Sequence, residues 1–158
     1  MNCACIAVNA SDMALGAKIK TTKRILSADD FFAADIMKYT ILDHDELVEE
    51  IEIPAPKTTN RQGYQKFRIR NAIDFSIVSL AYSFDLDGDA IKDANIVLGA
   101  VAPIPLRAQA IEDFLEGKKL EDETAVTAGK IAVQSVKPLL KNAFKVQIVK
   151  ALLKKVLV

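Results

Sequence analysis

Two long alternating segments joined by an Asp-Gly pair constrain the fold of this chain more than any other feature. From Ile77 to Leu86 every second side chain is apolar, so one face of an extended segment carries Val78, Leu80, Tyr82, Phe84 and Leu86. Asp87-Gly88 follows, a pair typical of tight hairpin turns, and Ile91–Val101 alternates again before Pro103 and Pro105. The sequence therefore predicts a long antiparallel hairpin with one buried face.

The segments around this hairpin indicate the rest of a domain. Before it, Tyr64–Arg70 alternates as a strand, with Tyr64 and Lys66 opposite Gln65 and Phe67. After it, the patterns predict three helices: Leu106–Glu116, Glu121–Val136 and a last helix that is capped by Asn142 and runs to the end. The apolar stripe expected on the last helix consists of Phe144, Ile148, Ala151, Leu152 and Val156. Strands followed by helices predict an α+β fold, a three- to four-stranded antiparallel sheet with helices packed on one face.

The first third of the chain reads as a separate unit. It contains an expected helix from Asn2 to Leu15 that ends at Gly16, an edge-like strand over Ala17–Lys23, a helical turn capped by Ser27, and a strand over Leu47–Pro54. Prolines and polar residues then mark a connection near Lys57–Arg61. We therefore expect two domains, residues 1–57 and residues 62–158.

Charge and cysteine usage limit the partners and the compartment. Lys plus Arg equals Asp plus Glu at 21 each, so no net charge favours nucleic acid or an anionic membrane. No apolar run reaches the roughly 18 residues of a membrane span, and no secretory signal is recognisable. Cys3 and Cys5 are expected to be thiols rather than a disulfide, which indicates a cytoplasmic protein.

The sequence offers no expected catalytic residue and no expected metal ligand. The single histidine, His44, lies in D-H-D, a pattern more typical of a solvated turn than of a positioned base. Cys3 and Cys5 would need two further ligands to hold a metal ion, and that remains the less favoured alternative. Asp85–Asp89 reads D-L-D-G-D, but position twelve of the corresponding calcium loop is Ile96 in place of glutamate, so a hairpin turn is expected there.

The glycines argue against a phosphate cradle. The chain has six glycines, and no two of them lie within ten residues of each other. A loop that wraps a diphosphate with backbone N–H groups needs clustered glycines. We therefore expect that this chain cannot build such a loop by itself.

The central block carries a resemblance to a known family. Tyr64–Val78 reads Y-Q-K-F-R-I-R-N-A-I-D-F-S-I-V and Ile96–Ala108 reads I-V-L-G-A-V-A-P-I-P-L-R-A. Both blocks, with the preceding E-L-V-E-E-I-E-I-P-A-P of Glu46–Pro56 and the E-D-F-L-E-G-K of Glu112–Lys118, resemble the medium, FAD-binding subunit of the xanthine dehydrogenase, aldehyde oxidase and carbon monoxide dehydrogenase family. The similarity covers nearly the whole chain from Ala17 onward, and its specific part is the run from Tyr64 to Ala108.

The resemblance implies a place for this chain in the FAD-binding subunit. In the family two regions build the FAD site, a carboxy-terminal α+β domain closes over it, and two glycine-rich loops upstream of the residues seen here hold the diphosphate. Residues 1–57 would then be a remnant of the second FAD-binding region, in a truncated or a split subunit. The family's flavin-loop aspartate would fall where Asn2 and Cys3 stand. We expect FAD in the complete subunit and none on this chain alone.

Two residues are candidate cofactor contacts through the resemblance. Lys66 matches the family's lysine near the flavin ring, where an ammonium group stabilises the anionic reduced flavin. Val48 matches the apolar residue that touches the isoalloxazine ring. The alternatives are an exposed strand lysine and a strand residue in the core. Near Lys66, the charged residues Arg68, Arg70 and Asp74 fit a solvated strand face better than a loop that controls access of the electron acceptor.

The implied function is electron transfer within an oxidoreductase. In the family, a molybdopterin-binding large subunit oxidises the substrate, and electrons pass through the 2Fe-2S clusters of a small subunit to FAD and on to NAD or another acceptor. The isolated chain is then expected to be inactive. The alternative is a non-catalytic module that assembles the same complex without touching the cofactor. The substrate and the acceptor stay open at this point.

Overall fold

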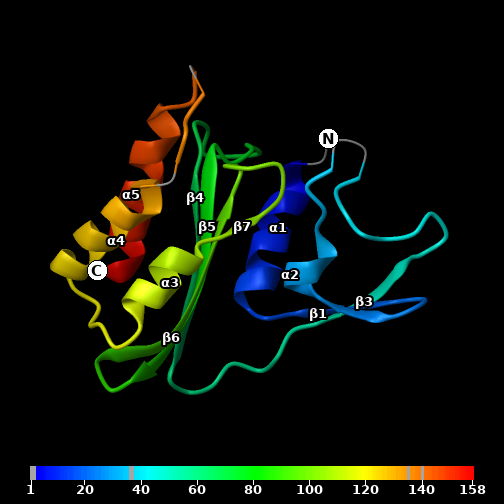
Figure 1. The fold of residues 1–158 in the computed structure, drawn as a ribbon, viewed down its shortest axis with the longest axis horizontal. Helices are drawn as coiled ribbons and strands as arrows, with labels where there is room; N and C mark the ends of the chain where they lie inside the picture. The colour runs from blue at the N-terminus through cyan, green and yellow to red at the C-terminus, as the bar shows by residue number, and fades with distance from the viewer. Residues whose placement is uncertain (1–2, 36–37, 135, 140) are drawn as a thin grey trace.

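The computed structural model is an α+β fold built on two antiparallel sheets, as the sequence predicts (Figure 1). It describes residues 3–35, 38–134, 136–139 and 141–158, and only the backbone of residues 3–8. In chain order the elements are α1 (Cys3–Ala14), β1 (Lys18–Thr21), β2 (Ile25–Ser27), α2 (Ala28–Phe31), β3 (Val48–Glu52), β4 (Asn60–Phe67), β5 (Val78–Asp87), β6 (Ala90–Gly99), β7 (Leu106–Arg107), α3 (Gln109–Leu115), α4 (Asp122–Gln134) and α5 (Phe144–Leu157).

The larger sheet has the strand order β4-β5-β6-β7, with every neighbouring pair antiparallel. Its centre is the predicted hairpin, in which Asp87 pairs with Ala90 across a turn where Gly88 has a φ of 60°. Glycine suits this turn because it adopts a positive φ without a steric penalty. The order leaves β4 at one edge of the sheet.

The two faces of the larger sheet are covered by different helices. The predicted apolar face of β5 packs with α3, α4 and α5 in a core that includes Leu80, Phe84, Leu115 and Leu153. On the other face, Ala81 and Val97 pack against three residues of α1: Ala10, Met13 and Ala14. Figure 1 shows the three carboxy-terminal helices on one side of the sheet and α1 on the other. The sheet therefore forms the middle layer of the molecule.

The smaller sheet has the order β2-β1-β3, which makes β1 its central strand. The prediction of an edge-like strand over Ala17–Lys23 was wrong in this respect, because the short return strand β2 pairs with one side of β1 and β3 with the other. Ile19 and Thr21, which lie on one side of this strand, are both buried. Gly16, with a φ of 65°, ends α1 as expected, and Ser27 caps the single turn of α2 by accepting a bond from the Asp30 amide at 3.1 Å.

Two strand boundaries differ from the prediction. β4 begins at Asn60, inside the expected connection, and ends at Phe67 rather than Arg70, because Asn60 pairs with Asp85 and the chain leaves the sheet after Phe67. The helix expected to begin at Leu106 begins at Gln109, because Leu106 and Arg107 first add β7 to the edge of β6.

The last helix also departs from its predicted pattern. It begins at Phe144 with Ala143 at the N-cap, so the predicted cap by Asn142 was wrong. Of the expected stripe, Phe144 and Ala151 are exposed. The buried residues are Val149, Leu152, Leu153, Val156 and Leu157, a face that α4 and β5 cover together. The predicted stripe is thus confirmed at Leu152 and Val156, and at Ile148, which packs against the same core, but not at Phe144 and Ala151.

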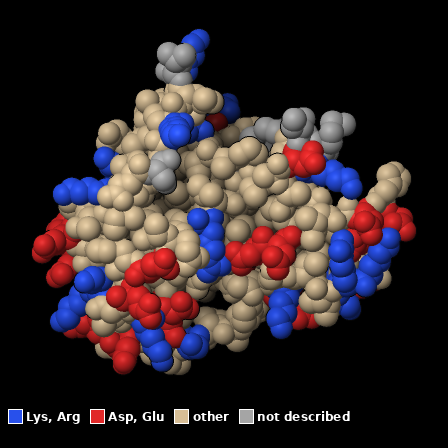
Figure 2. Space-filling model, viewed as in Figure 1, with Lys and Arg blue, Asp and Glu red and all other residues tan. Residues whose placement is uncertain are grey.

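The surface mixes charges of both signs. Figure 2 shows Lys or Arg side chains close to Asp or Glu side chains along the lower and outer parts of one face. Within the described residues, no helix combines the length and the apolar character that crossing a membrane requires.

Candidate functional site

Lys66 lies near the end of the edge strand β4. Its cross-strand partner is Ser79 of β5, and Tyr64 pairs with Ala81 two residues away, so these four residues share one face of the sheet. Because Ala81 packs against α1, this is the face turned toward the amino-terminal part of the molecule. Lys66 is half-buried there.

A loop between β4 and β5 holds the Lys66 ammonium group, which donates a hydrogen bond to the backbone carbonyl of Asp74. The Asp74 carboxylate accepts bonds from the amides of Ile69 at 3.1 Å and Arg70 at 2.8 Å. The Arg70 amide, and then that of Ile69, hold the pKa of Asp74 below its ordinary value against the opposing effect of burial. Asp74 is therefore the organiser of a loop, and Arg70 and Asp74 do not lie on the strand face that the sequence favoured.

The same loop presents large apolar side chains to solvent. Ile69 is 82% exposed, Ile73 is 96% exposed and Phe75 is 62% exposed. Ile73 also has a φ of 44°, a conformation that β-branched residues rarely adopt. Apolar surface concentrated beside a fixed cation is typical of a place where another molecule or segment packs.

Val48 lies in the other sheet. It begins β3 and pairs with Thr21 next to an irregularity in the register of β1. Its side chain is 41% exposed, so it is not a core residue. Leu47, Ile51 and Ile53 beside it are exposed as well. Val48 therefore lies in the smaller sheet and Lys66 in the larger one.

A buried carboxylate that sequence reasoning missed fixes the start of β3. The Glu46 side chain is fully buried and accepts bonds from Thr21 Oγ1 at 2.6 Å and from Arg24 Nε at 3.0 Å and Nη2 at 2.9 Å. The Arg24 bond, followed by those of Thr21 and the Asp43 amide, lowers the pKa of Glu46 to about 2. A Thr and an Arg about 22 to 25 residues upstream gave no sequence signal, because only the fold brings them together.

The neighbouring D-H-D motif has a structural role. Lys23 Nζ lies 3.3 Å from Asp43 Oδ2 and 2.6 Å from Asp45 Oδ1, and these two carboxylates raise the pKa of Lys23. His44 between them is exposed. The D-L-D-G-D segment is likewise occupied by protein groups, since Asp85 accepts bonds from Lys57 at 2.6 Å and Thr59 at 2.7 Å.

Glycines matter here because a loop that holds a diphosphate needs several of them close together. Gly16, Gly88 and Gly117 serve turns with a positive φ. Gly63 lies under the Tyr82 ring, and Gly129 faces Lys150 within the helix pair α4 and α5. In the part of the chain that the structure describes, these glycines thus serve turns and close packing. The described residues also contain no group of three or more His, Cys, Asp and Glu that could hold a metal ion; of Cys3 and Cys5 only the backbone, in α1, is described.

Sequence comparison gives consistent relatives. Residues 62–158 match the family described as CO dehydrogenase flavoprotein C-terminal domain. The glyceraldehyde dehydrogenase medium chain of Sulfolobus acidocaldarius is 34% identical over 103 residues, which cover 63% of this chain and 34% of the relative. A xanthine dehydrogenase FAD-binding subunit of Escherichia coli O157:H7 is 26% identical over 121 residues, which cover 73% of this chain and 41% of the relative.

Solved structures share the fold over most of the chain. The carbon monoxide dehydrogenase of Hydrogenophaga pseudoflava superposes with a TM-score of 0.84 at 26% identity, covering 94% of this chain and 54% of that one. Quinoline 2-oxidoreductase of Pseudomonas putida 86 gives 0.78 at 27% identity, with 94% and 53% covered. The chain thus spans little more than half the length of these solved chains and about two fifths or less of the curated relatives.

Proposed function

Because this chain belongs to the family of CO dehydrogenase flavoprotein C-terminal domains, we propose that it closes the FAD site in the flavoprotein subunit of a molybdenum hydroxylase. The relatives named above include an FAD-binding subunit of xanthine dehydrogenase, which supports FAD as the cofactor of the complete subunit. The diphosphate of FAD would be held by polypeptide outside the described residues, since these contain no clustered glycines.

The observation that carries this proposal is the position of the Lys66 ammonium group. Among the described residues it makes one hydrogen bond, to the Asp74 carbonyl, and an ammonium group has three donors, so a ligand at the sheet edge could accept from it as well. FAD, when bound, accepts electrons and gains negative charge along the N1 and C2 carbonyl edge of its ring. Lys66 would stabilise that charge through a charge-assisted hydrogen bond in a fixed geometry.

Val48 would supply an apolar contact to the ring. Its side chain is 41% exposed at the start of β3, with other exposed apolar residues beside it. The buried Glu46 and its bonds to Arg24 and Thr21 hold this strand start in place. A flat aromatic ring packed on Val48 would remove that apolar surface from water.

The proposed partners are a molybdopterin-binding large subunit and a 2Fe-2S small subunit, with electrons passing through FAD to NAD or another acceptor. The carbon monoxide dehydrogenase of Hydrogenophaga pseudoflava is an enzyme with a molybdenum cofactor, which supports a molybdopterin-binding partner. Residues 62–158 would form the closing domain and residues 1–57 a part of the FAD-binding region. A cytoplasmic location fits this assembly.

A second candidate is an assembly module without cofactor contact. The exposed apolar side chains of Ile69, Ile73 and Phe75 favour it, because such surface is typical of subunit interfaces. The two functions differ in whether they need Lys66. An assembly module would bind its partners equally well without the ammonium group.

The test is co-expression of this chain with the amino-terminal, FAD-binding part of a related subunit. We expect the purified pair to show flavin absorbance and the chain alone to show none. Lys66→Met should lower the amount of FAD retained after gel filtration, while Lys20→Met, which changes a half-buried lysine paired with Glu49 at 3.6 Å, should not. Equal FAD in both variants together with normal pairing would favour the assembly module.

A further inference from the structure

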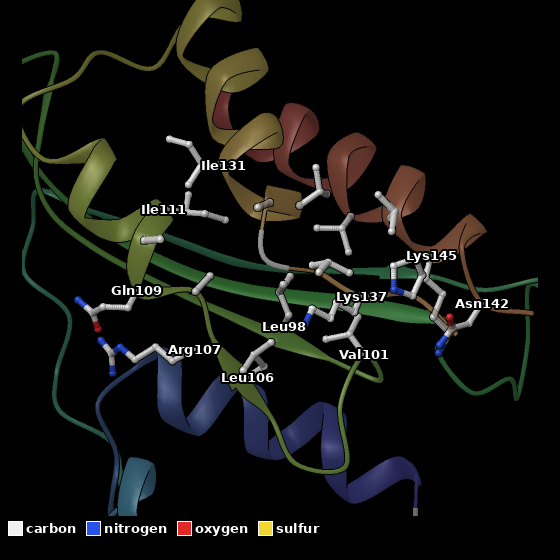
Figure 3. Close-up of a pocket in the computed structure, with 18 residues that line it drawn as sticks. Leu98, Val101, Leu106, Arg107, Gln109, Ile111, Ile131, Lys137, Asn142 and Lys145 are labelled. Carbon is white, nitrogen blue, oxygen red and sulfur yellow. The ribbon is translucent and has the colours of Figure 1, made fainter. Parts of the chain in front are cut away.

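A cavity of about 510 Å³ lies on the helix face of the larger sheet, away from the edge strand β4. Its walls come from β6, β7, α3, α4 and α5 (Figure 3). Leu98 and Leu106 form the side toward the sheet, and Ile111, Ile131 and Val149 form the helical side. The volume falls within the roughly 300–1,000 Å³ of small-molecule sites, and the apolar lining is typical of them.

The polar groups at this cavity are cations and amides. Lys137, Lys145 and Asn142 gather at one end, and Arg107 and Gln109 lie at the other (Figure 3). No Asp or Glu occurs among the described residues that line it. A ligand that enters therefore meets apolar walls and positive charge.

Arg107 is not available to such a ligand. Its guanidinium group donates to both oxygens of Asp29, to Glu112 and to Asn95. The opposite end differs. Lys145 Nζ makes one hydrogen bond, to the Ala100 carbonyl at 2.6 Å, and Lys137 makes no hydrogen bond or ion pair to any described residue. Among the described residues that line the cavity, the cations without a carboxylate partner thus lie at the end that holds Lys137 and Lys145.

Asn142 adds an unsatisfied polar atom at the same end. Its Oδ1 is buried without a hydrogen-bond partner in the part of the chain that the structure describes. A buried acceptor without a partner costs free energy. The amide nitrogen of the same side chain is a donor in either orientation, and Asn142 lines the cavity beside the two lysines.

We propose that this cavity binds an organic monocarboxylate with an apolar body, such as a medium-chain fatty acid. The carboxylate would pair with Lys137 and Lys145 and accept a bond from Asn142, and the hydrocarbon would fill the space along Leu98 and Ile131. The site shares no residue with the Lys66 loop. It therefore stands independently of the proposed flavin function.

The test is isothermal titration calorimetry of the full chain with sodium octanoate, compared with octylammonium chloride and octanol. We expect saturable binding of octanoate with one site per chain, weaker binding of octanol, and no binding of octylammonium. Lys137→Met should weaken octanoate binding about tenfold and leave octanol unchanged. Lys154→Met, which changes a lysine of α5 paired with Asp122 outside the cavity, should have no effect.

A substitution that fills the cavity provides a second test of binding. Ala132→Phe places a ring in the space and should abolish binding of octanoate and octanol alike, with an unchanged circular dichroism spectrum. If this variant does not fold, Lys137→Met decides alone. The proposal is overturned if octanoate shows no saturable binding, if octylammonium binds as well as octanoate, or if the Lys137 and Lys154 variants behave alike.

Discussion

The ammonium group of Lys66 donates a hydrogen bond to the backbone carbonyl of Asp74, eight residues further along the chain. The carboxylate of the same Asp74 holds the amides of Ile69 and Arg70. One residue therefore fixes both the loop between β4 and β5 and the lysine at its base. A candidate flavin contact and the shape of the loop beside it depend on the same side chain and backbone.

Loss of the Asp74 carboxylate should loosen this loop. Asp74→Ala removes the acceptor of two backbone amides at 2.8 and 3.1 Å, so the loop loses the bonds that close it. We expect trypsin to cleave after Arg68 and Arg70 about 5- to 30-fold faster, in line with a loss of about 1–2 kcal/mol of local stability. Mass spectrometry of the timed digest measures this. Asp93→Asn, an exposed change in β6, should leave the rate unaltered.

A side chain at Gly63 should destabilise the larger sheet. A Cβ there would lie 2.7 Å from Tyr82 Oη and 2.9 Å from Cζ of the same ring, which is too close for the packed strand pair. Gly63→Ala is expected to lower the free energy of unfolding by about 1–3 kcal/mol in urea titrations. Adding Tyr82→Phe should recover part of the loss, because the nearest atom is then absent.

Gly129 offers a matched control for that experiment. It lies inside α4, and a Cβ there would be 3.6 Å from the nearest atom of Lys150, an ordinary contact. Gly129→Ala should raise the stability by about 0.5–1 kcal/mol, because alanine has the higher helix propensity. Equal effects of alanine at positions 63 and 129 would contradict the strand packing described.

Arg107 should be needed for the contact between the amino-terminal part and the larger sheet. Its Nη1 lies 2.9 Å and 3.0 Å from the two Asp29 oxygens, and its Nε lies 3.0 Å from the buried Glu112. Arg107→Met leaves the Glu112 carboxylate buried without its cation, so we expect a loss of about 3 kcal/mol in thermal or urea unfolding. Asp29→Asn removes only the more exposed pair and should cost about 1 kcal/mol or less.

Acid should destabilise the protein partly through Glu46. Its pKa falls from 4.5 to about 2 on folding, chiefly through the Arg24 bond, so its ionised form stabilises the folded state above pH 4.5. That stabilisation is lost as the pH falls from about 4.5 toward 2. Unfolding free energies measured across this range should fall more steeply for the wild type than for Glu46→Gln. Parallel curves would show that Glu46 is not held ionised by its partners.

The larger sheet could be predicted from the sequence because the patterns that indicate it are local. Alternation in Ile77–Leu86 and the turn at Asp87-Gly88 each act over a few residues, and the observed hairpin follows them. The errors arose where distant pairing decides the outcome. β1 became a central strand only because Ile25–Ser27 returns beside it, and Leu106 joined a strand because the edge of β6 was free. Neither pairing leaves a trace in local periodicity.

The candidate site could be predicted from the sequence only in part. Lys66 came from the resemblance, and its position in β4 followed from the alternation around it. The role of Asp74 did not, because sequence placed Arg70 on a strand and gave no reason for the chain to turn back after Phe67. Glu46 and Arg24 are 22 residues apart and meet through the fold alone. Whether Lys66 and Val48 touch a flavin stays a prediction.

The most direct test of the central claim is the reduction potential of the flavin in the reconstituted FAD-binding subunit. If the Lys66 ammonium group faces the ring, Lys66→Met removes a positive charge that stabilises the reduced flavin, and the midpoint potential should fall by several tens of millivolts, on the order of 1–3 kcal/mol for a two-electron couple. Lys20→Met should leave it unchanged. An identical potential in wild type and Lys66→Met, at equal FAD content, would contradict the account.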